Sequence, residues 1–111
     1  MLHKMKLQQK PFDSIKTGQK TIEMRLNDEK RRLINIGDEI EFTCVVGGEK
    51  LQVSVCGLVQ FDSFDTLYNT FNKRVLGYDD DEVANPTDMS KYYSIDEQKE
   101  YGVLAIVIKL M

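Results

Sequence analysis

The chain has 111 residues, of which 41% are hydrophobic and 30% are charged, and its formal net charge is −3. These values are typical of a soluble globular protein, and we expect residues 1–111 to form a single domain with its own core. They exclude a protein that coats duplex DNA, which needs a broad basic surface. No apolar run approaches the roughly 20 residues of a membrane-spanning helix.

Charge is distributed unevenly along the chain. Residues 61–111 carry ten acidic and five basic side chains, whereas the stretch from Lys10 to Arg32 carries seven basic and four acidic ones. An extended basic surface is therefore not expected. A local basic groove for a nucleotide or a single strand is compatible with this distribution.

The cysteines and the N-terminus indicate a cytoplasmic protein. Cys44 and Cys56 both lie in strand-like segments, so we expect free buried thiols and no disulfide. His3 is the only histidine, so we expect no metal site of histidine and cysteine. No cofactor is expected. The charged stretch 1–6 is not followed by a long apolar run, and no secretory leader is predicted.

Strand and helix patterns alternate at the start of the chain. Met5 and Leu7 alternate with polar residues and predict a first strand. Residues 10–18 predict a short helix, with Pro11 in its first turn and Gly18 at its C-terminal end. Residues 21–26 then alternate with the period of two that is typical of a half-buried strand.

Two further strands follow a charged loop at residues 27–32. A turn at Gly37-Asp38 precedes a strand over residues 39–46, and Gly47-Gly48 predicts a hairpin turn into a strand over residues 51–61. In this last strand one face is expected to carry Leu51, Val53, Val55 and Gly57.

The second half of the chain mixes helices with irregular structure. Ser63 is expected to cap a helix with Phe64, Leu67, Tyr68 and Phe71 on its apolar face. Residues 72–91 show no regular pattern, and segments of this length often form lids or contain small helices. A capping box at residues 94–97 predicts a short helix, and residues 102–110 predict the final strand.

The order of these elements favours a mostly antiparallel sheet or barrel with flanking helices, because the central strands are too close in sequence for helical crossovers. The alternation predicts that one set of side chains points inward: Ile22, Met24, Ile40, Phe42, Val53, Val55 and Ile106.

Three segments combine into a recognisable pattern: Thr17-Gly18, the segment from Lys20 to Leu26 and the segment from Ile36 to Ile40. This pattern resembles a known family, the ASCH domains of the PUA-like superfamily. The resemblance continues at residues 64–68, 92–94 and 101–103, and so covers nearly the whole chain. It implies an α+β fold, a PUA-like and mostly antiparallel β-barrel with flanking short helices.

The resemblance also implies a function. ASCH domains are expected to recognise RNA or a nucleotide, and this implies RNA, a nucleotide or a nucleoside as partner and neither a membrane nor duplex DNA. One branch of the family hydrolyses acetylated cytidine, with catalytic residues that match the positions of Lys20 and Glu23, and another member acts on RNA. In the first branch the second position is a threonine, whereas this chain has Glu23.

The strand over residues 21–26 provides the candidate ligand-binding residues. Thr21, Glu23 and Arg25 are spaced two residues apart and so share one face of the strand, whereas Lys20 would point to the opposite face. Lys20 stands at the start of the strand, and it reaches a cavity shared with Glu23 only if the chain bends away from the strand there. Glu23 and Arg25 form either a structural ion pair or a site in which Arg25 holds a phosphate or carbonyl oxygen and Glu23 accepts a base amine. If the protein is an enzyme, Lys20 and Glu23 are the catalytic candidates.

The other charged and aromatic residues each allow a structural and a functional interpretation. Tyr92 and Tyr93 either stack on bases or pack against the core. The run 30–32 is either a solvated basic loop or a contact to a nucleic-acid backbone, and the acidic run 79–82 is either a solvated loop or a magnesium site. Spacing fixes no metal ligands, so no metal site is expected.

Overall fold

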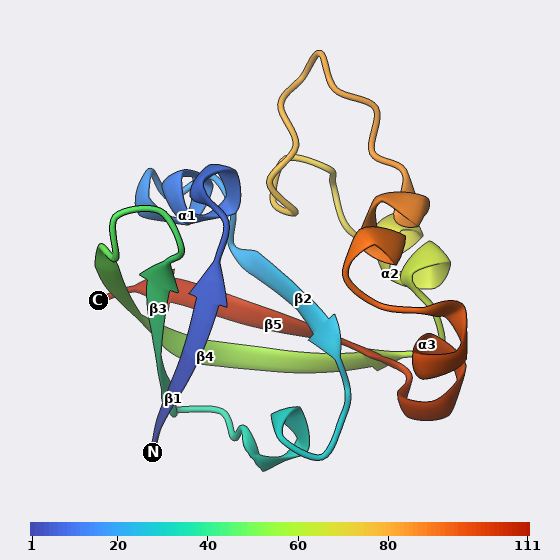
Figure 1. The fold of residues 1–111 in the computed structure, drawn as a ribbon, viewed down its shortest axis with the longest axis horizontal. Helices are drawn as coiled ribbons and strands as arrows, with labels where there is room; N and C mark the ends of the chain where they lie inside the picture. The colour runs from blue at the N-terminus through green and yellow to red at the C-terminus, as the bar shows by residue number, and fades with distance from the viewer.

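The computed structural model describes all 111 residues as a curled five-stranded sheet with short helices beside it (Figure 1). The strand order in the sheet is β1-β3-β4-β5-β2. In chain order the elements are β1 (Leu2–Leu7), α1 (Gln9–Lys16), β2 (Ile22–Leu26), the 3-10 helix η1 (Arg31–Leu33), β3 (Glu39–Cys44), β4 (Lys50–Phe61), α2 (Phe64–Thr70), the 3-10 helix η2 (Pro86–Lys91), α3 (Ile95–Tyr101) and β5 (Val103–Leu110). None of the helices has the length and hydropathy that crossing a membrane requires.

The sheet is mostly antiparallel, as the sequence predicts, but it is an open half-barrel. The pairs β3–β4, β4–β5 and β5–β2 are antiparallel, and β1 pairs with β3 in parallel. The parallel pair is possible because the chain passes through α1 and β2 between β1 and β3. This connection brings the chain back to the end of the sheet at which β1 begins, so β3 can run in the same direction as β1. The edge strands β1 and β2 are joined by a side chain, since Arg25 Nη2 donates to the Lys6 carbonyl oxygen at 2.9 Å.

Two apolar clusters form the core. The larger one lies inside the curl and is built from β1, α1, β3, β4 and β5, with Phe12, Ile40 and Phe42 among its fully buried members. The smaller one lies between β2, the start of β5, α2 and the segment that follows α2, and it includes Leu67. All seven side chains expected to point inward are buried.

These seven side chains do not share one core, however. Five of them belong to the larger cluster, whereas Ile22 and Met24 belong to the smaller one. The expectation of one common interior was therefore wrong for β2. The physical reason is that both faces of β2 are covered. Successive side chains of a strand point to opposite faces, so Ile22 and Met24 lie in the smaller cluster while Glu23 lies on a buried polar face.

A β-bulge changes the face that β4 presents. The register to β5 shifts between Val55 and Gly57, so that Cys56 is an extra residue in the strand. Leu58, and not Gly57, packs against the same cluster as Val53 and Val55. The expectation of two buried thiols was wrong for Cys56: Cys44 is buried and Cys56 is exposed, and both are free. Cys56 follows the buried Val55 directly, so it points to the opposite face of the strand.

The helix ends follow the local sequence signals. Gly18 follows the last residues of α1 with a φ of 86°, a conformation that glycine adopts without the steric cost of a Cβ. Ser63 caps α2 by accepting the Thr66 N–H, and Ser94 forms the full capping box with Glu97 at the start of α3. Phe71 ends α2 in an extended conformation, so it lies beyond the helical face on which it was expected.

The irregular segment 72–91 is fastened to the rest of the molecule. The Val75 carbonyl oxygen accepts the N–H groups of Thr21 and Ile22, and Gln19 Nε2 donates to the Tyr78 carbonyl oxygen at 3.0 Å. Figure 1 shows this segment arching beside α1 before it enters η2. It therefore forms a wall opposite α1 and β2.

Candidate functional site

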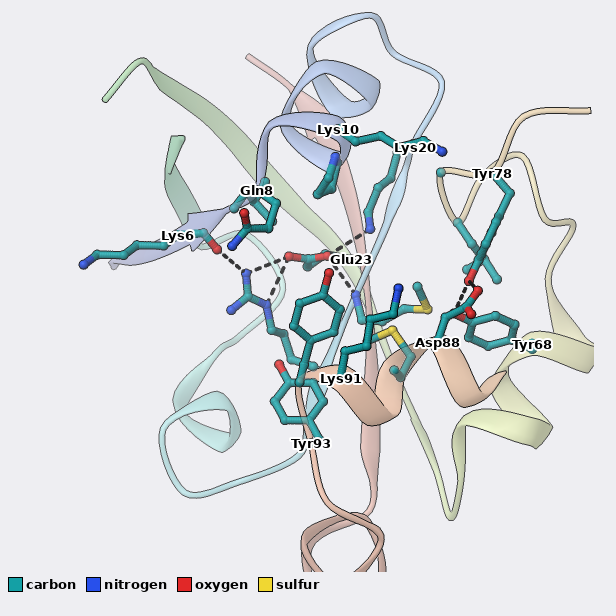
Figure 2. Close-up of a pocket in the computed structure, with 18 of the residues that line it drawn as sticks. Lys6, Gln8, Lys10, Lys20, Glu23, Tyr68, Tyr78, Asp88, Lys91 and Tyr93 are labelled. Atoms are coloured by element: carbon teal, nitrogen blue, oxygen red, sulfur yellow. Dashed lines mark hydrogen bonds and ion pairs between the residues drawn. The ribbon is translucent and has the colours of Figure 1, made fainter. Parts of the chain in front are cut away.

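A cavity of about 400 Å³ lies between the edge strands and the segment 72–93. One side is formed by the end of β1, the start of α1 and β2, and the other by α2, residues 76–78 and η2 with the two tyrosines that follow it (Figure 2). Its volume falls within the range of roughly 300–1,000 Å³ that is typical of small-molecule sites. The basic side chains that line it are Lys10, Lys20, Arg25 and Lys91, and the acidic ones are Glu23 and Asp88. Lys6 contributes its backbone, and its side chain points away from the cavity (Figure 2).

The Glu23 carboxylate lies between two cations in this cavity. Its Oε1 is 3.1 Å from Lys20 Nζ and accepts the Met24 backbone N–H at 3.1 Å. Its Oε2 accepts two hydrogen bonds from Arg25, from Nε at 3.1 Å and from Nη2 at 2.8 Å. Lys20 and Glu23 are only 6% and 3% exposed, so the three side chains form a buried charge cluster.

The two cations keep Glu23 ionised. Burial by itself raises the pKa of the carboxyl group, but the charges of Lys20 and Arg25 and their hydrogen bonds outweigh it and lower the pKa of Glu23 to about 2. Burial likewise lowers the pKa of Arg25, and the Glu23 charge outweighs this and raises the pKa overall. Glu23 is therefore a carboxylate at neutral pH.

The position of Lys20 resolves the parity conflict seen in the sequence. β2 begins at Ile22, so the strand alternation does not apply to Lys20 or Thr21. The Lys20 N–H donates to the Ser14 carbonyl oxygen, and its side chain turns toward Glu23. Thr21 does not line the cavity, although it has the parity of Glu23; its N–H bonds to the Val75 carbonyl oxygen and its own carbonyl accepts the Ile108 N–H.

Gly77 covers the aliphatic stem of Lys20 and was not singled out by the sequence patterns. A Cβ at this position would lie 3.1 Å from Lys20 Cδ, and the backbone φ is +104°, which L side chains rarely adopt. The glycine therefore permits the close approach of residues 76–78 to Lys20. In sequence it stands in a patternless segment, where nothing distinguishes it from a loop glycine.

A chain of hydrogen bonds that the sequence did not predict lines the other side of the cavity. The hydroxyl groups of Tyr68 and Tyr78 are 2.8 Å apart, and the Tyr78 hydroxyl donates to Asp88 Oδ2 at 2.8 Å (Figure 2). Burial is the main cause that raises the pKa of Tyr78 and of Tyr68, so both hydroxyl groups stay protonated at neutral pH. The three residues come from α2, the segment after it and η2, and no spacing rule connects them.

Tyr92 and Tyr93 both line the cavity, but in different ways. The Tyr93 ring stacks on Phe64, with 6.1 Å between centroids and an interplanar angle of 16°. Burial raises the pKa of Tyr93, and the nearby Arg25 charge lowers it less than burial raises it. Tyr92 is 57% exposed, so its ring is available to a ligand. Tyr93 packs against the smaller cluster and is only partly accessible.

The remaining charged runs lie outside the cavity. Arg31 pairs with Asp28 at 3.3 Å. Arg32 Nε donates to the Asn27 carbonyl oxygen, and neither Lys30 nor Arg32 forms an ion pair. In the acidic run, Glu82 forms an ion pair with Lys10. No three histidine, cysteine, aspartate or glutamate side chains are grouped so that they could hold a metal ion.

Comparison with known proteins yields one family and several similar folds. The family model described as ASCH domain matches residues 5–111. The crystal structure of hypothetical protein PH0355 is 34% identical with a TM-score of 0.84, and covers 100% of both chains. The solution structure of Protein PF0455 from Pyrococcus furiosus is also 34% identical, with a TM-score of 0.72, over 100% of this chain and 98% of that one.

More distant similarity concerns the fold alone. The crystal structure of ASCH from Zymomonas mobilis is 15% identical with a TM-score of 0.69, and the match covers 97% of this chain and 66% of that one. No curated protein sequence matches the chain.

Proposed function

The chain belongs to the ASCH domain family, and from this premise we propose that it recognises RNA or a nucleotide in the cavity beside Lys20, Glu23 and Arg25. The observation that carries the proposal is the charge of this cavity. Four basic side chains, those of Lys10, Lys20, Arg25 and Lys91, line it against two acidic ones (Figure 2), in a protein whose net charge is −3. An anionic ligand is therefore attracted to this cavity and repelled by most of the remaining surface.

Lys20 and Arg25 are the groups proposed to hold the anion. An ammonium carries three donors and a guanidinium five. Lys20 uses one of its donors on Glu23, and Arg25 uses its Nε and Nη2 on Glu23 and on the Lys6 carbonyl oxygen. Arg25 Nη1 and the other Lys20 protons stay available for a phosphate or carbonyl oxygen, with Glu23 as the group that positions both cations.

Tyr92 completes the proposed site. Exposed aromatic rings beside a basic pocket stack on bases, with a contribution of about 1–3 kcal/mol per base. Tyr92 is the exposed ring of this cavity. Tyr93, which is stacked on Phe64, then limits the depth to which the base enters.

Hydrolysis of a modified nucleoside is the alternative, and the geometry favours it less. A general base works best when its pKa lies near the working pH, whereas the pKa of Glu23 is about 2. No serine, threonine, cysteine or histidine lines the cavity, so a covalent intermediate on one of these residues is not available. We therefore expect no turnover of acetylcytidine by the purified protein, and release of acetate in proportion to enzyme would establish the hydrolase instead.

Fluorescence anisotropy with labelled single-stranded RNA of mixed sequence, together with calorimetric titration of nucleoside monophosphates, tests the proposal. Lys91→Ala removes an exposed cation that lines the cavity, and Lys30→Ala removes an exposed cation outside it. Both changes remove one positive charge from the surface. We expect Lys91→Ala to weaken binding several-fold and Lys30→Ala to leave it nearly unchanged.

Tyr92→Ala gives a second, uncharged test, with an expected loss of about 5- to 150-fold in affinity if a base stacks on this ring. Equal effects of Lys91→Ala and Lys30→Ala would indicate a diffuse surface contact. Absence of binding to every RNA and nucleotide would overturn the proposed function.

A further inference from the structure

Glu23 has no capacity left to accept a hydrogen bond from a ligand. A carboxylate offers about four lone-pair sites. In Glu23 they receive the Lys20 ammonium and the Met24 N–H on Oε1, and two N–H groups of Arg25 on Oε2. A base amine that bound to Glu23 would have to displace a buried cation, so the acceptor for such an amine must be another group.

Asp88 is the other carboxylate of the cavity, and its sites are largely free. Its Oδ2 accepts the Tyr78 hydroxyl at 2.8 Å, and its Oδ1 has no hydrogen-bond partner within the protein. The ion pairs that involve a cavity residue are those of Glu23 with Lys20 and Arg25 and that of Lys10 with Glu82, which lies outside the cavity. Asp88 has no cationic partner among them.

The direction of the hydrogen bonds in the Tyr68–Tyr78–Asp88 chain is fixed. A carboxylate only accepts, so the single Tyr78 proton points to Asp88. The bond between the two hydroxyl groups must then use the Tyr68 proton. Both of these tyrosine protons are committed, so the Tyr68 and Tyr78 hydroxyl groups have no proton left to donate to a ligand (Figure 2).

We propose that Asp88, oriented by Tyr78, is a specificity-determining residue that selects bases with an exocyclic amine over the corresponding bases with a carbonyl group. An amine donates to the free Oδ1, whereas a carbonyl oxygen at the same place meets a carboxylate and is repelled. A carboxylate pairs in the same way with the N4 amine of cytosine in nucleic-acid recognition. This inference rests on the proposed function, and it adds the chemical class of base that the cavity takes.

Two nearly isosteric ligand pairs test it: CMP against UMP, and AMP against IMP. In each pair a carbonyl group replaces the exocyclic amine, and the neighbouring ring nitrogen changes from an acceptor to an N–H donor. The same pairs are used as RNA pentamers of C, U, A and inosine, in case binding needs more than one phosphate. We expect the amine-bearing member of at least one pair to bind about tenfold or more tightly than its partner.

Asp88→Asn is the decisive variant. The oxygen of the new side-chain amide can still accept the Tyr78 hydroxyl, and the amide nitrogen then offers a donor where Oδ1 was an acceptor. The preference for the amine should therefore collapse or invert, a result that a merely structural role would not produce. Asp80→Asn is the control with the same loss of charge, since the Asp80 side chain is 82% exposed and pairs with Arg74 outside the cavity.

Asp88→Ala keeps the test decisive if Asp88→Asn does not fold, as judged by circular dichroism, because it removes the acceptor and should abolish the preference for the amine. Tyr78→Phe tests the orientation: it removes the hydroxyl from Asp88 Oδ2 and leaves the carboxylate in place, so the preference should become smaller but keep its sign. Retention of the full preference in a folded Asp88→Asn or Asp88→Ala overturns the inference.

The two proposals fail in different ways. If the members of both pairs bind equally well, the inference is overturned and the proposed function stands. If no nucleotide and no pentamer binds, the proposed function is overturned and the inference falls with it.

Discussion

At the scale of single residues, the charge cluster of Glu23 is the feature with the largest expected energy. A buried ion pair adds little when compared with apolar residues of the same volume, but removing one member leaves the partner charge buried and uncompensated. Glu23 is shared by Lys20 and Arg25. One substitution at this position therefore affects two cations.

Glu23→Gln should lower the free energy of unfolding by about 3–5 kcal/mol at pH 7. Because the folded pKa of Glu23 is about 2, below the ordinary value of 4.5, the stabilisation is complete above pH 4.5 and is lost as the pH falls toward 2. The difference between the two proteins should shrink over that interval. Urea unfolding at several pH values measures it.

Glu41→Gln is the matched control for this change. Glu41 pairs with Lys50 at 3.3 Å, and the Lys50 side chain is 61% exposed. Such a pair contributes about 1 kcal/mol or less. Equal losses in the two variants would contradict a special role for the buried cluster.

Gly77→Ala tests the contact between the segment 76–78 and Lys20. The left-handed backbone at Gly77 costs a non-glycine residue about 1–3 kcal/mol, and the added Cβ would press on Lys20 Cδ at 3.1 Å. We expect lower stability together with weaker nucleotide binding, because Lys20 is displaced. Gly37→Ala has a similar backbone, with a φ of +94° and nothing near its Cβ, so it should lose stability alone.

At the scale of elements, the two capped helices differ in what they bury. α2 places Phe64, Leu67 and Tyr68 in the core, whereas α3 has no buried residue. Both begin with a serine whose side chain accepts a backbone N–H. The same chemical change at the two caps should therefore have different consequences.

Ser63→Ala should lower the global free energy of unfolding by about 1 kcal/mol, because fraying of α2 uncovers the smaller cluster. Ser94→Ala should fray α3 and change the global value by less than about 0.5 kcal/mol. Urea unfolding gives the global values, and amide exchange in α3 gives the local one. A larger global loss for Ser94→Ala would show that α3 supports the core.

An element could be predicted from the sequence where it depends on residues that are close together in the chain. The alternation of β2, the caps at Ser63 and Ser94 and the turn at Gly47-Gly48 are local patterns, and each corresponds to the observed element. The bulge at Cys56 is not local, since it depends on the register with β5. The parallel pairing of β1 likewise depends on where the chain returns after β2.

The contacts of the candidate site likewise include some that follow from the local sequence and others that need the tertiary fold. Glu23 and Arg25 are two residues apart in one strand, so their pairing follows from the strand period. Asp88 and Tyr78 meet only because the segment 72–91 folds back against α2. No spacing in the sequence encodes such a contact, and this part of the cavity could be found only from the structure.

At the scale of the whole molecule, the two apolar clusters share one strand. β5 contributes Leu104, Ile106 and Ile108 to the larger cluster and Val103 and Ala105 to the smaller one. If β5 separates from the sheet, both clusters become exposed to water. The sheet and the helical side are therefore expected to unfold together.

Leu67→Ala, a change in the smaller cluster, should lower the global stability by about 2–5 kcal/mol and shift two probes equally. All five tyrosines lie between residues 68 and 101, so tyrosine fluorescence reports the helical side and far-ultraviolet circular dichroism includes the sheet. Coincident urea transitions are expected in the wild type and in the variant. Separate midpoints would show that the smaller cluster unfolds on its own.

The charge of the whole chain limits how RNA can bind. The acidic half repels an extended phosphate backbone, so two to three phosphates are expected to contact the cavity. At roughly −0.7 per contact on a single strand, log affinity should fall against log salt concentration with a slope of about −1.5 to −2. Binding isotherms at several salt concentrations measure this slope, and a value steeper than about −5 would indicate an extended contact surface.

The bond from Arg25 Nη2 to the Lys6 carbonyl oxygen has a consequence for the motions of the sheet. The edges of the half-barrel are joined there by a side chain that also lines the cavity, and not by a backbone ladder. Thermal separation of β1 from β2 must therefore carry Arg25 away from one of its partners. A ligand that anchors the guanidinium should slow hydrogen–deuterium exchange at the amides of both edge strands, and mass-spectrometric exchange would detect occupancy of the cavity as protection along its rim.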